Sequence, residues 1–260
     1  MSQKELFFKS AERAFAENGI LLFHFASVDS TNKRAIEYAR EGGDVPALFW
    51  AEKQTAGSGR LGRSFFSPEG TGLYMTLLTE VSGQERAFSL LTSLAAVCAR
   101  EAIDEVLGTG VGIKWVNDLY LDGKKVAGIL AQSFFCDDRR FVALGVGINI
   151  STRDFPVELL DKAGSLLCSC EADSDAVKRD IALCFCKNLL KALGADGFDE
   201  YMERYRRYSC VIGSGVRFSQ NGEEHVGVAE DITEDGALKV RLDSGETMLL
   251  SSGEISLFVE

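Results

Sequence analysis

The chain of 260 residues is short of basic side chains, with 28 Lys and Arg against 39 Asp and Glu and a net charge of -11 at pH 7. Phosphate binding is largely electrostatic, so this balance argues against a general nucleic-acid-binding surface. No apolar run approaches the roughly 20 residues that a membrane-spanning helix needs. The first residues also lack the order of a signal peptide. We therefore expect a cytoplasmic protein that contacts neither membrane nor nucleic acid.

A disulfide framework is a second feature that the sequence does not support. The seven cysteines are an odd number, and most lie in apolar segments, which favours reduced, buried thiols. Cys168 with Cys170 and Cys184 with Cys186 form two closely spaced pairs. Zinc ligands usually have two to four residues between them, and residues two apart on a helix do not face each other. Core packing is therefore favoured over a structural metal site.

Apolar periodicity predicts an α/β (α+β) domain over residues 1–209, with a mixed sheet flanked by helices. Several strands follow one another directly, which disfavours strict βαβ alternation. In the expected helix 85–107, the inward side chains are Phe88, Leu91, Leu94, Ala95 and Cys98. The other expected helices are 4–17, 33–40, 174–193 and 198–208. The expected strands are 20–25, 47–52, 72–79, 111–115, 118–121, 125–135 and 140–150, with a hairpin turn at Asp122-Gly123.

The pattern of residues changes after Cys210, and residues 210–260 predict a separate, small SH3-like all-β barrel. Four glycine-containing turn pairs, at 221–222, 235–236, 244–245 and 252–253, divide this region. Five strands are expected, at 211–218, 224–232, 237–242, 246–250 and 255–259.

The glycine-rich stretch 54–63, Gln-Thr-Ala-Gly-Ser-Gly-Arg-Leu-Gly-Arg, carries most of the functional information. Glycine allows backbone N–H groups to approach a ligand closely and to adopt positive φ. Arg60 and Arg63 add planar, permanently charged groups that suit carboxylate and phosphate. An anion-binding loop at the end of a strand is therefore one interpretation, and a mobile surface turn is the other.

Three further stretches carry polar groups in suggestive positions. Lys114 and Lys125 flank a predicted hairpin that also contains Asn117 and Asp118, whose oxygens are of the kind that Mg²⁺ accepts. A solvated hairpin with surface lysines is the alternative. Two glycines interrupt the strand that ends at Asn149, which indicates either a close approach to the backbone or a bulge. The run 30–32, together with Gln54, suits an uncharged polar ligand or ordinary helix capping.

Taken together, these stretches resemble the biotin protein ligases. The family's Ser-Thr-Asn corresponds to residues 30–32, and its Gly-Arg-Gly-Arg-x-Gly-Arg loop corresponds to 57–63. Its Lys-Trp-Pro-Asn-Asp corresponds to 114–118, and its Lys-x-Ala-Gly-Ile-Leu to 125–130. Its Gly-x-Gly-x-Asn corresponds to 145–149, and the resemblance extends to Gly-Glu-Ile-Ser-Leu at 253–257. Five loose motifs in the right order are a highly specific combination.

The resemblance implies activation of biotin by ATP to biotinyl-adenylate, followed by transfer to a lysine of a biotin carboxyl carrier protein. Mg²⁺ is expected near Asp118, and Arg60 and Lys125 are expected to be catalytic. The implied biotin-binding residues are Ser30, Thr31, Asn32, Gln54, Gly57, Ser58, Gly59, Arg60, Lys125, Gly128, Gly145 and Gly147. The implied ATP- or adenylate-binding residues are Arg60, Arg63, Phe65, Lys114, Asn117, Asp118 and Asn149.

Three positions depart from the family pattern. Ser58 replaces the first loop arginine, Val116 replaces a proline, and Phe258 stands where some bacterial members carry an arginine. The chain resembles the shorter ligases that have no N-terminal DNA-binding domain. Lipoate ligases share the fold, and a non-catalytic biotin-binding protein is a further alternative. A homodimer through the sheet edge around 110–150 is left open, as is the purpose of the small barrel.

Overall fold

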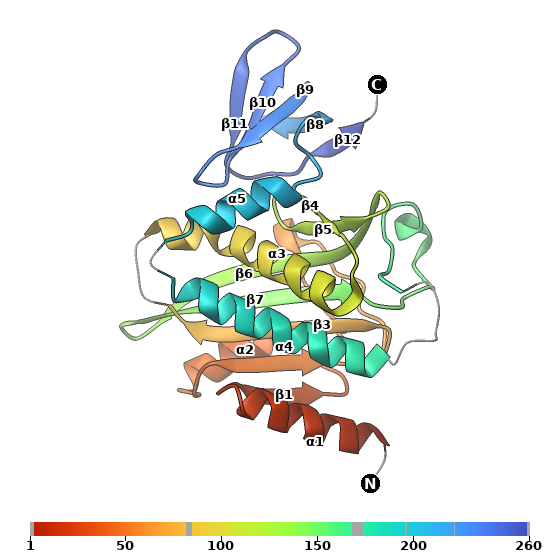
Figure 1. Cartoon of the computed structure of the whole chain (residues 1–260), viewed down its shortest axis with the longest axis vertical. Coiled ribbons are helices and arrows are strands. Elements are labelled where there is room, and N and C mark those ends of the chain that lie inside the picture. Colours follow the sequence, from red (N-terminus) through yellow and green to blue (C-terminus); the bar gives the residue numbers. More distant parts are fainter. Residues whose placement is uncertain (1–2, 82–84, 168–173, 196, 221, 259–260) are drawn as a thin grey trace.

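A seven-stranded mixed sheet forms the centre of the molecule, as seen in a computed structural model that describes residues 3–81, 85–167, 174–195, 197–220 and 222–258 (Figure 1). Its strand order is β1-β2-β3-β7-β6-β5-β4. Strands β1 and β2 are parallel and all other neighbours are antiparallel. The strands are β1 (Leu21–Phe25), β2 (Ala47–Ala51), β3 (Gly72–Glu80), β4 (Gly112–Lys114), β5 (Asp118–Leu121), β6 (Lys124–Cys136) and β7 (Arg139–Asn149). The predicted mixed sheet is confirmed.

Helices cover both faces of this sheet, which explains why β2 is apolar at every position. Leu48 and Trp50 pack in the larger core with α1 (Gln3–Ala16), α3 (Glu85–Leu107) and α4 (Ser174–Leu193). Ala47 and Phe49 pack on the other face, against α2 (Thr31–Arg40). Figure 1 shows α3 and α4 side by side across the front of the sheet. Because both faces are buried, the strand reads as a continuous apolar run rather than an alternating one.

The predicted helices agree closely with the structure. Leu91, Leu94, Ala95 and Cys98 of α3 are buried as expected, whereas the side chain of Phe88 lies outside the described part. Helix α2 begins two residues earlier than predicted. Its N-cap, Ser30, makes no side-chain capping hydrogen bond, so capping does not explain the polar residues at this end of the helix.

A second, five-stranded antiparallel sheet confirms the all-β C-terminal unit. Its order is β11-β10-β9-β8-β12. The strands are β8 (Gly215–Gln220), β9 (Glu223–Ile232), β10 (Leu238–Leu242), β11 (Thr247–Leu250) and β12 (Ser256–Phe258). The first strand starts later than predicted, because the Ser214 amide closes a turn onto the Val211 carbonyl and Gly213 has a φ of 84°.

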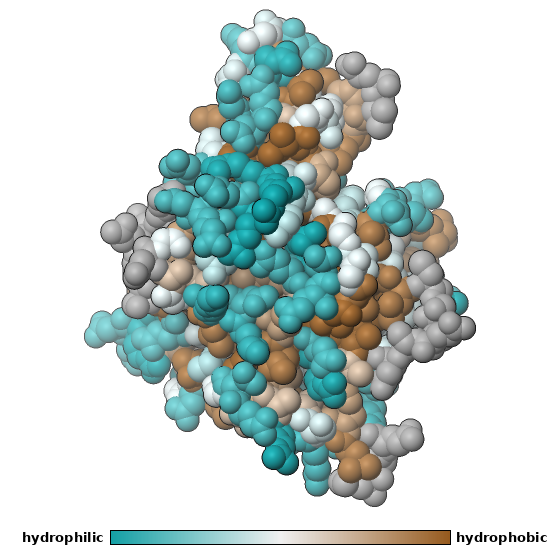
Figure 2. Space-filling model, viewed as in Figure 1, coloured by the Kyte–Doolittle hydropathy of each residue, from teal (hydrophilic) through white to brown (hydrophobic). Residues whose placement is uncertain are grey.

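The second sheet is packed directly onto the first part of the chain. Val211, Phe218 and Leu238 belong to the same buried cluster as residues of α3 and of α5 (Asp199–Tyr208). The indole Nε1 of Trp115 also donates to the Gly236 carbonyl at 2.9 Å. Figure 2 shows a predominantly hydrophilic surface over α5, whose apolar side faces this shared core. The two sheets therefore share one hydrophobic core.

The cysteines occupy separate environments. Cys98, Cys136, Cys184, Cys186 and Cys210 are free thiols. Cys186 is buried in the core, whereas the Cys184 thiol lies 2.9 Å from Glu105, so this pair does not face a common point. Cys168 and Cys170 lie outside the described residues. Within the described residues, no helix combines the length and the apolarity that crossing a bilayer demands.

Candidate active site

The glycine-rich stretch folds back on itself as a small hairpin. The Gly59 amide donates to the Arg63 carbonyl at 2.7 Å, and the Phe65 amide donates to the Gly57 carbonyl at 2.9 Å. At the tip, Leu61 and Gly62 have φ values of 55° and 73°. Positive φ is tolerated best by glycine, and Leu61, a residue that is 73% exposed, also adopts it. We call residues 54–65 the flap.

The flap closes over a cavity of about 1010 Å³. Its wall combines residues of α2, the flap, the β4–β6 region, β7, the segment 159–162 and the C-terminal sheet. Most of the residues predicted to bind ligand line it: Ser30, Thr31, Asn32, Gln54, Ser58, Gly59, Arg60, Arg63, Phe65, Lys114, Asn117, Asp118, Lys125, Gly128, Gly145 and Gly147. The structure thus brings segments more than 100 residues apart to one pocket.

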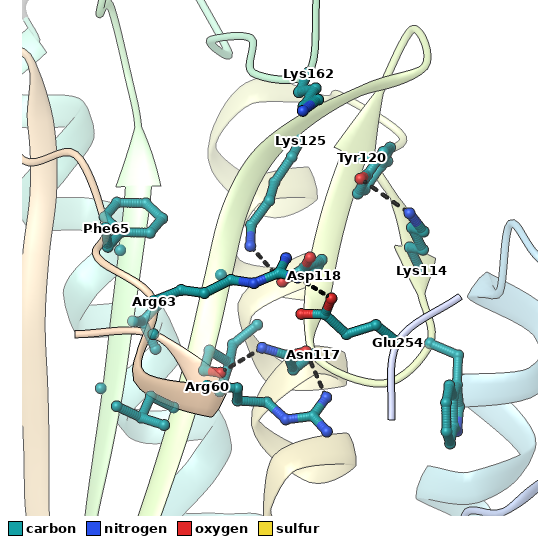
Figure 3. A pocket seen from close by; sticks show the side chains of 18 of the residues that line it. Arg60, Arg63, Phe65, Lys114, Asn117, Asp118, Tyr120, Lys125, Lys162 and Glu254 are labelled. Carbon is teal, nitrogen blue, oxygen red and sulfur yellow. Dashed lines mark hydrogen bonds and ion pairs between the residues drawn. The ribbon is translucent and has the colours of Figure 1, made fainter. Parts of the chain in front are cut away.

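Lys125 and Asp118 form an ion pair in this cavity, with Nζ and Oδ1 separated by 2.7 Å (Figure 3). The pairing of β5 with β6 shifts between Leu119 and Tyr120, so that Tyr120 pairs with Lys125 and Asp118 with Gly128. Such a bulge re-aims side chains, and here it brings Lys125 to the side of Gly128. A Cβ on Gly128 would lie 3.2 Å from the Lys125 ammonium. The glycine leaves room for the ion pair.

Two arginines connect the flap with the rest of the wall. Arg60 donates to Asn117 Oδ1 at 3.0 Å and to the Gly253 carbonyl at 3.3 Å. Arg63 forms an ion pair with Glu254 (Figure 3). Both arginines therefore contact the segment that leads into β12, so the C-terminal sheet contributes directly to the cavity.

Lys114 completes the positively charged side of the wall. Its ammonium donates to the Tyr120 hydroxyl at 3.2 Å. Burial raises the pKa of Tyr120, and the nearby Asp118 carboxylate raises it further, so this hydroxyl stays protonated at neutral pH. Lys162 also lines the cavity, and its backbone carbonyl accepts from the Lys125 amide at 2.8 Å.

The opposite end of the cavity is polar but uncharged. The Thr31 amide and hydroxyl lie 2.9 and 3.1 Å from Gln54 Oε1. Gln54 Nε2 donates to Ser67 Oγ at 3.2 Å, and the Ser67 hydroxyl donates to the Phe65 carbonyl at 2.9 Å. Hydrogen bonds from the flap therefore hold this end in shape.

Glycines 145 and 147 lie in an unbroken strand, so the alternative of a bulge is wrong. Gly145 pairs with Thr76 and Leu130 in regular register. A Cβ on Gly145 would collide with Asn32 Oδ1, and one on Gly147 would lie 2.6 Å from the Phe65 ring. The groups that approach these glycines closely are thus side chains of the protein itself.

Two predicted site residues do not line the cavity. Asn149 is buried and donates from Nδ2 to the Gly164 carbonyl at 3.0 Å, so it anchors the segment after β7. Gly57 is also buried, and a Cβ there would lie 2.8 Å from the Phe65 carbonyl, so it permits the flap to close on itself.

Several wall residues had no role predicted from the sequence, among them Tyr120, Lys162, Cys210 and Glu254. Glu254 lies in the Gly-Glu-Ile-Ser-Leu motif at 253–257, which the family resemblance includes, so that motif could have indicated its place in the site. The others carry no pattern of their own and reach the cavity only through the fold. Phe258 is not part of the wall, and the Arg217 guanidinium lies 5.9 Å from the centre of its ring.

Related proteins share both parts of the chain. The Biotin/lipoate A/B protein ligase family matches residues 24–149, and the Biotin protein ligase C terminal domain matches residues 211–257. The bifunctional ligase/repressor BirA of Bacillus subtilis (strain 168) is 34% identical over 237 residues, which are 89% of this chain and 72% of that protein. The biotin–[acetyl-CoA-carboxylase] ligase of Mycobacterium tuberculosis is 31% identical over 242 residues, covering 88% of this chain and 86% of that protein.

Among solved structures, one of a biotin protein ligase from Aquifex aeolicus in complex with biotin and ATP has the same fold. Its TM-score is 0.74 at 27% sequence identity, and the match covers 92% of this chain and 99% of that chain.

Proposed function

The chain belongs to the biotin protein ligase family and is an ATP-dependent biotin ligase, and from this premise we propose which residues perform the reaction and what the acceptor is. The observation that carries the assignment of residues is the meeting of Arg60, Lys125 and Asp118 in one cavity whose other end is polar and uncharged. An anion-binding end and a neutral end match the two ends of biotin.

The reaction has two steps. In the first, a biotin carboxylate oxygen attacks the α-phosphorus of ATP, the bond between the α-phosphorus and its bridging oxygen breaks, and pyrophosphate leaves. In the second, a lysine amine attacks the carbonyl carbon of the mixed anhydride, an amide forms, and AMP leaves with the electron pair of the broken bond. The amine loses a proton to solvent in this step.

The main obstacle in the first step is the repulsion between two anions. We assign Arg60 and Lys125 to offset this repulsion and to stabilise the charge that develops at phosphorus. Arg63 and Lys114 supply further positive charge at the nucleotide end, with Asn117 and Phe65 beside them. The flap excludes water from the anhydride, because hydrolysis would destroy the intermediate.

Magnesium fits the residues of this cavity. Mg²⁺ in nucleotide sites is usually held by one or two carboxylates together with substrate phosphates. Asp118 supplies one such carboxylate in the wall, already beside the cation Lys125. Asp118 would hold the ion, and the ion would neutralise part of the negative charge on the phosphates of ATP.

The acceptor is the lysine of a biotin carboxyl carrier protein or domain, in keeping with the name of the M. tuberculosis relative.

A cytoplasmic location and a homodimer remain predictions from the sequence. At the sheet edge around β4, the Ile113 carbonyl already accepts the Cys210 amide at 2.9 Å, so part of that edge is paired within the chain.

Exchange of radiolabelled pyrophosphate into ATP tests this function. We expect exchange that depends on biotin, and competition in which lipoate does not replace biotin. Exchange with lipoate alone would contradict the substrate. A chain that binds biotin but forms no AMP in the presence of ATP and carrier would be a non-catalytic binder.

A further inference from the structure

Thr76 is a buried residue of β3 to which neither the sequence motifs nor the lining of the cavity assigns a role. Its side chain is fully shielded from solvent. Its hydroxyl oxygen lies 2.6 Å from Asn32 Oδ1 and 2.8 Å from the Thr31 hydroxyl oxygen. Thr76 therefore contacts both of these cavity residues from behind.

The direction of the first hydrogen bond follows from the neighbours of Asn32. Its Nδ2 lies 3.4 Å from the Leu130 carbonyl and 2.8 Å from Gln132 Oε1. A backbone carbonyl only accepts, so the nitrogen of the Asn32 amide must face β6 and the oxygen must face Thr76. An amide oxygen also only accepts. Thr76 therefore gives its single hydrogen mainly to Asn32 Oδ1.

The state of Thr31 follows in turn. The Thr76 hydroxyl is directed mainly at Asn32 Oδ1 and also at the Thr31 hydroxyl oxygen, which lies 2.8 Å away, so Thr31 accepts in this contact. The other neighbour of the Thr31 hydroxyl is Gln54 Oε1, which already accepts the Thr31 amide and is also only an acceptor. The Thr31 hydroxyl donates to Gln54 Oε1 at 3.1 Å, so its hydrogen stays inside the protein. Its oxygen keeps a lone pair for a ligand.

We propose that Thr76 is a positioning residue that holds the Thr31 and Asn32 side chains so that, toward the cavity, they accept hydrogen bonds rather than donate them. Thr31 Oγ1 and Asn32 Oδ1 each retain accepting capacity, while the hydrogens of both side chains are used within the protein. Such an end selects a head group with N–H donors, as the cyclic urea of biotin has. The inference rests on the proposed function and extends it to the origin of head-group specificity.

The test compares Thr76→Val with the wild type in biotin-dependent pyrophosphate exchange. Valine keeps the shape but leaves Asn32 Oδ1 without its donor, so we expect the KM for biotin to rise by about tenfold or more. The KM for ATP and kcat should stay within about threefold, since the nucleotide end is untouched. Thr76→Ser, which keeps the hydroxyl, should stay within about threefold of the wild type.

Thr79→Val is the matched control, because Thr79 is also buried on β3 but its hydroxyl contacts the Glu80 carbonyl. It should leave the KM for biotin unchanged. If Thr76→Val does not fold, Thr76→Ala against Thr76→Ser gives the same comparison. A biotin methylated at a ureido nitrogen should lose less affinity for Thr76→Val than for the wild type, because the two losses share one interaction.

Two results would overturn the proposal while leaving the ligase function intact. One is a Thr76→Val enzyme with the wild-type KM for biotin. The other is a Thr76→Ser enzyme as impaired as Thr76→Val, which would mean that packing rather than the hydroxyl matters. A wild-type protein without biotin-dependent exchange would instead overturn the proposed function and this inference with it.

Discussion

At the scale of single residues, the placement of Lys125 depends on one irregularity. Val126 is the extra residue that allows Lys125 to pair with Tyr120 while Ala127 pairs with Leu119. Regular alternation puts residues 125 and 128 on opposite faces of a strand. The bulge overrides it and brings the lysine to Asp118. The sequence motif shows that Lys125 lies three residues before Gly128. The direction of the Lys125 side chain, however, depends on how β6 pairs with β5.

Lys125→Ala should lower the rate of adenylate formation by about 100- to 1000-fold, as is usual when one electrostatic stabiliser of a developing charge is lost. Single-turnover release of pyrophosphate measures this rate. Lys124→Ala is the matched control, because the Lys124 ammonium contacts the Leu160 carbonyl. Pyrophosphate release at a near-normal rate in Lys125→Ala would refute the assigned role.

At the scale of elements, the flap is a hairpin with its own hydrogen bonds that is held down at its tip. Its internal bonds run from Gly57 to Phe65, and Arg60 holds it to Asn117 and Gly253. The bounds of helices and strands were predictable to within a few residues because most bury a periodic apolar face and β2 forms a continuous apolar run. The resemblance predicts that the flap orders over the intermediate, but the contacts that hold it down were not predictable, since its partners are 57 and 193 residues away along the chain.

Arg60→Gly should release biotinyl-adenylate about 10- to 100-fold faster, because it removes charge-assisted hydrogen bonds between the flap and the wall. Labelling of lysines on an unrelated protein reports the escaped intermediate. Leu61→Gly is the control, since it adds a flexible residue at the exposed tip and keeps the guanidinium. An Arg60→Gly enzyme that retained the intermediate as long as the wild type would contradict the assignment of the flap.

Glu254→Gln should also speed the release of biotinyl-adenylate, but by less than Arg60→Gly does. The paired side chains of Arg63 and Glu254 are 68% and 40% exposed, and exposed ion pairs contribute at most about 1 kcal/mol. We therefore expect the lifetime of the bound intermediate to fall by about fivefold or less, and the difference from the wild type to shrink at high salt. A loss comparable to that of Arg60→Gly would mean that Glu254 acts on the ligand itself.

At the scale of the whole molecule, a buried carboxylate joins the N-terminal helix to the sheet. Glu52 follows β2, pairs with Lys4 of α1 at 2.9 Å and lies 3.4 Å from His24 of β1. Burial by itself raises the pKa of Glu52, but hydrogen bonds from His24 and Lys4 outweigh it and lower the pKa to about 2. Such a group was not predictable, because nothing local distinguishes Glu52 from the surface glutamates.

Glu52→Gln should lower the free energy of unfolding at pH 7 by up to about 3 kcal/mol. This figure follows from the pKa of Glu52, which is 4.5 in the unfolded chain and about 2 in the folded protein. A depressed pKa stabilises the folded state above the unfolded pKa of 4.5, and this contribution is lost as the pH falls to about 2. Denaturant unfolding at pH 7 and at pH 3 measures it. A difference between wild type and variant that did not shrink on acidification would contradict the pairing.

The passage from the first sheet to the second has a consequence for how the protein comes apart. Ser209 bridges to Ile113, the Cys210 amide is bonded to the same strand, and Val211 is already fully buried. The junction is therefore hydrogen-bonded and packed from Ser209 to Val211 and is not an extended tether. Heating should therefore produce a single calorimetric peak with matching calorimetric and van't Hoff enthalpies, and the C-terminal fifty residues should not survive as a resistant fragment.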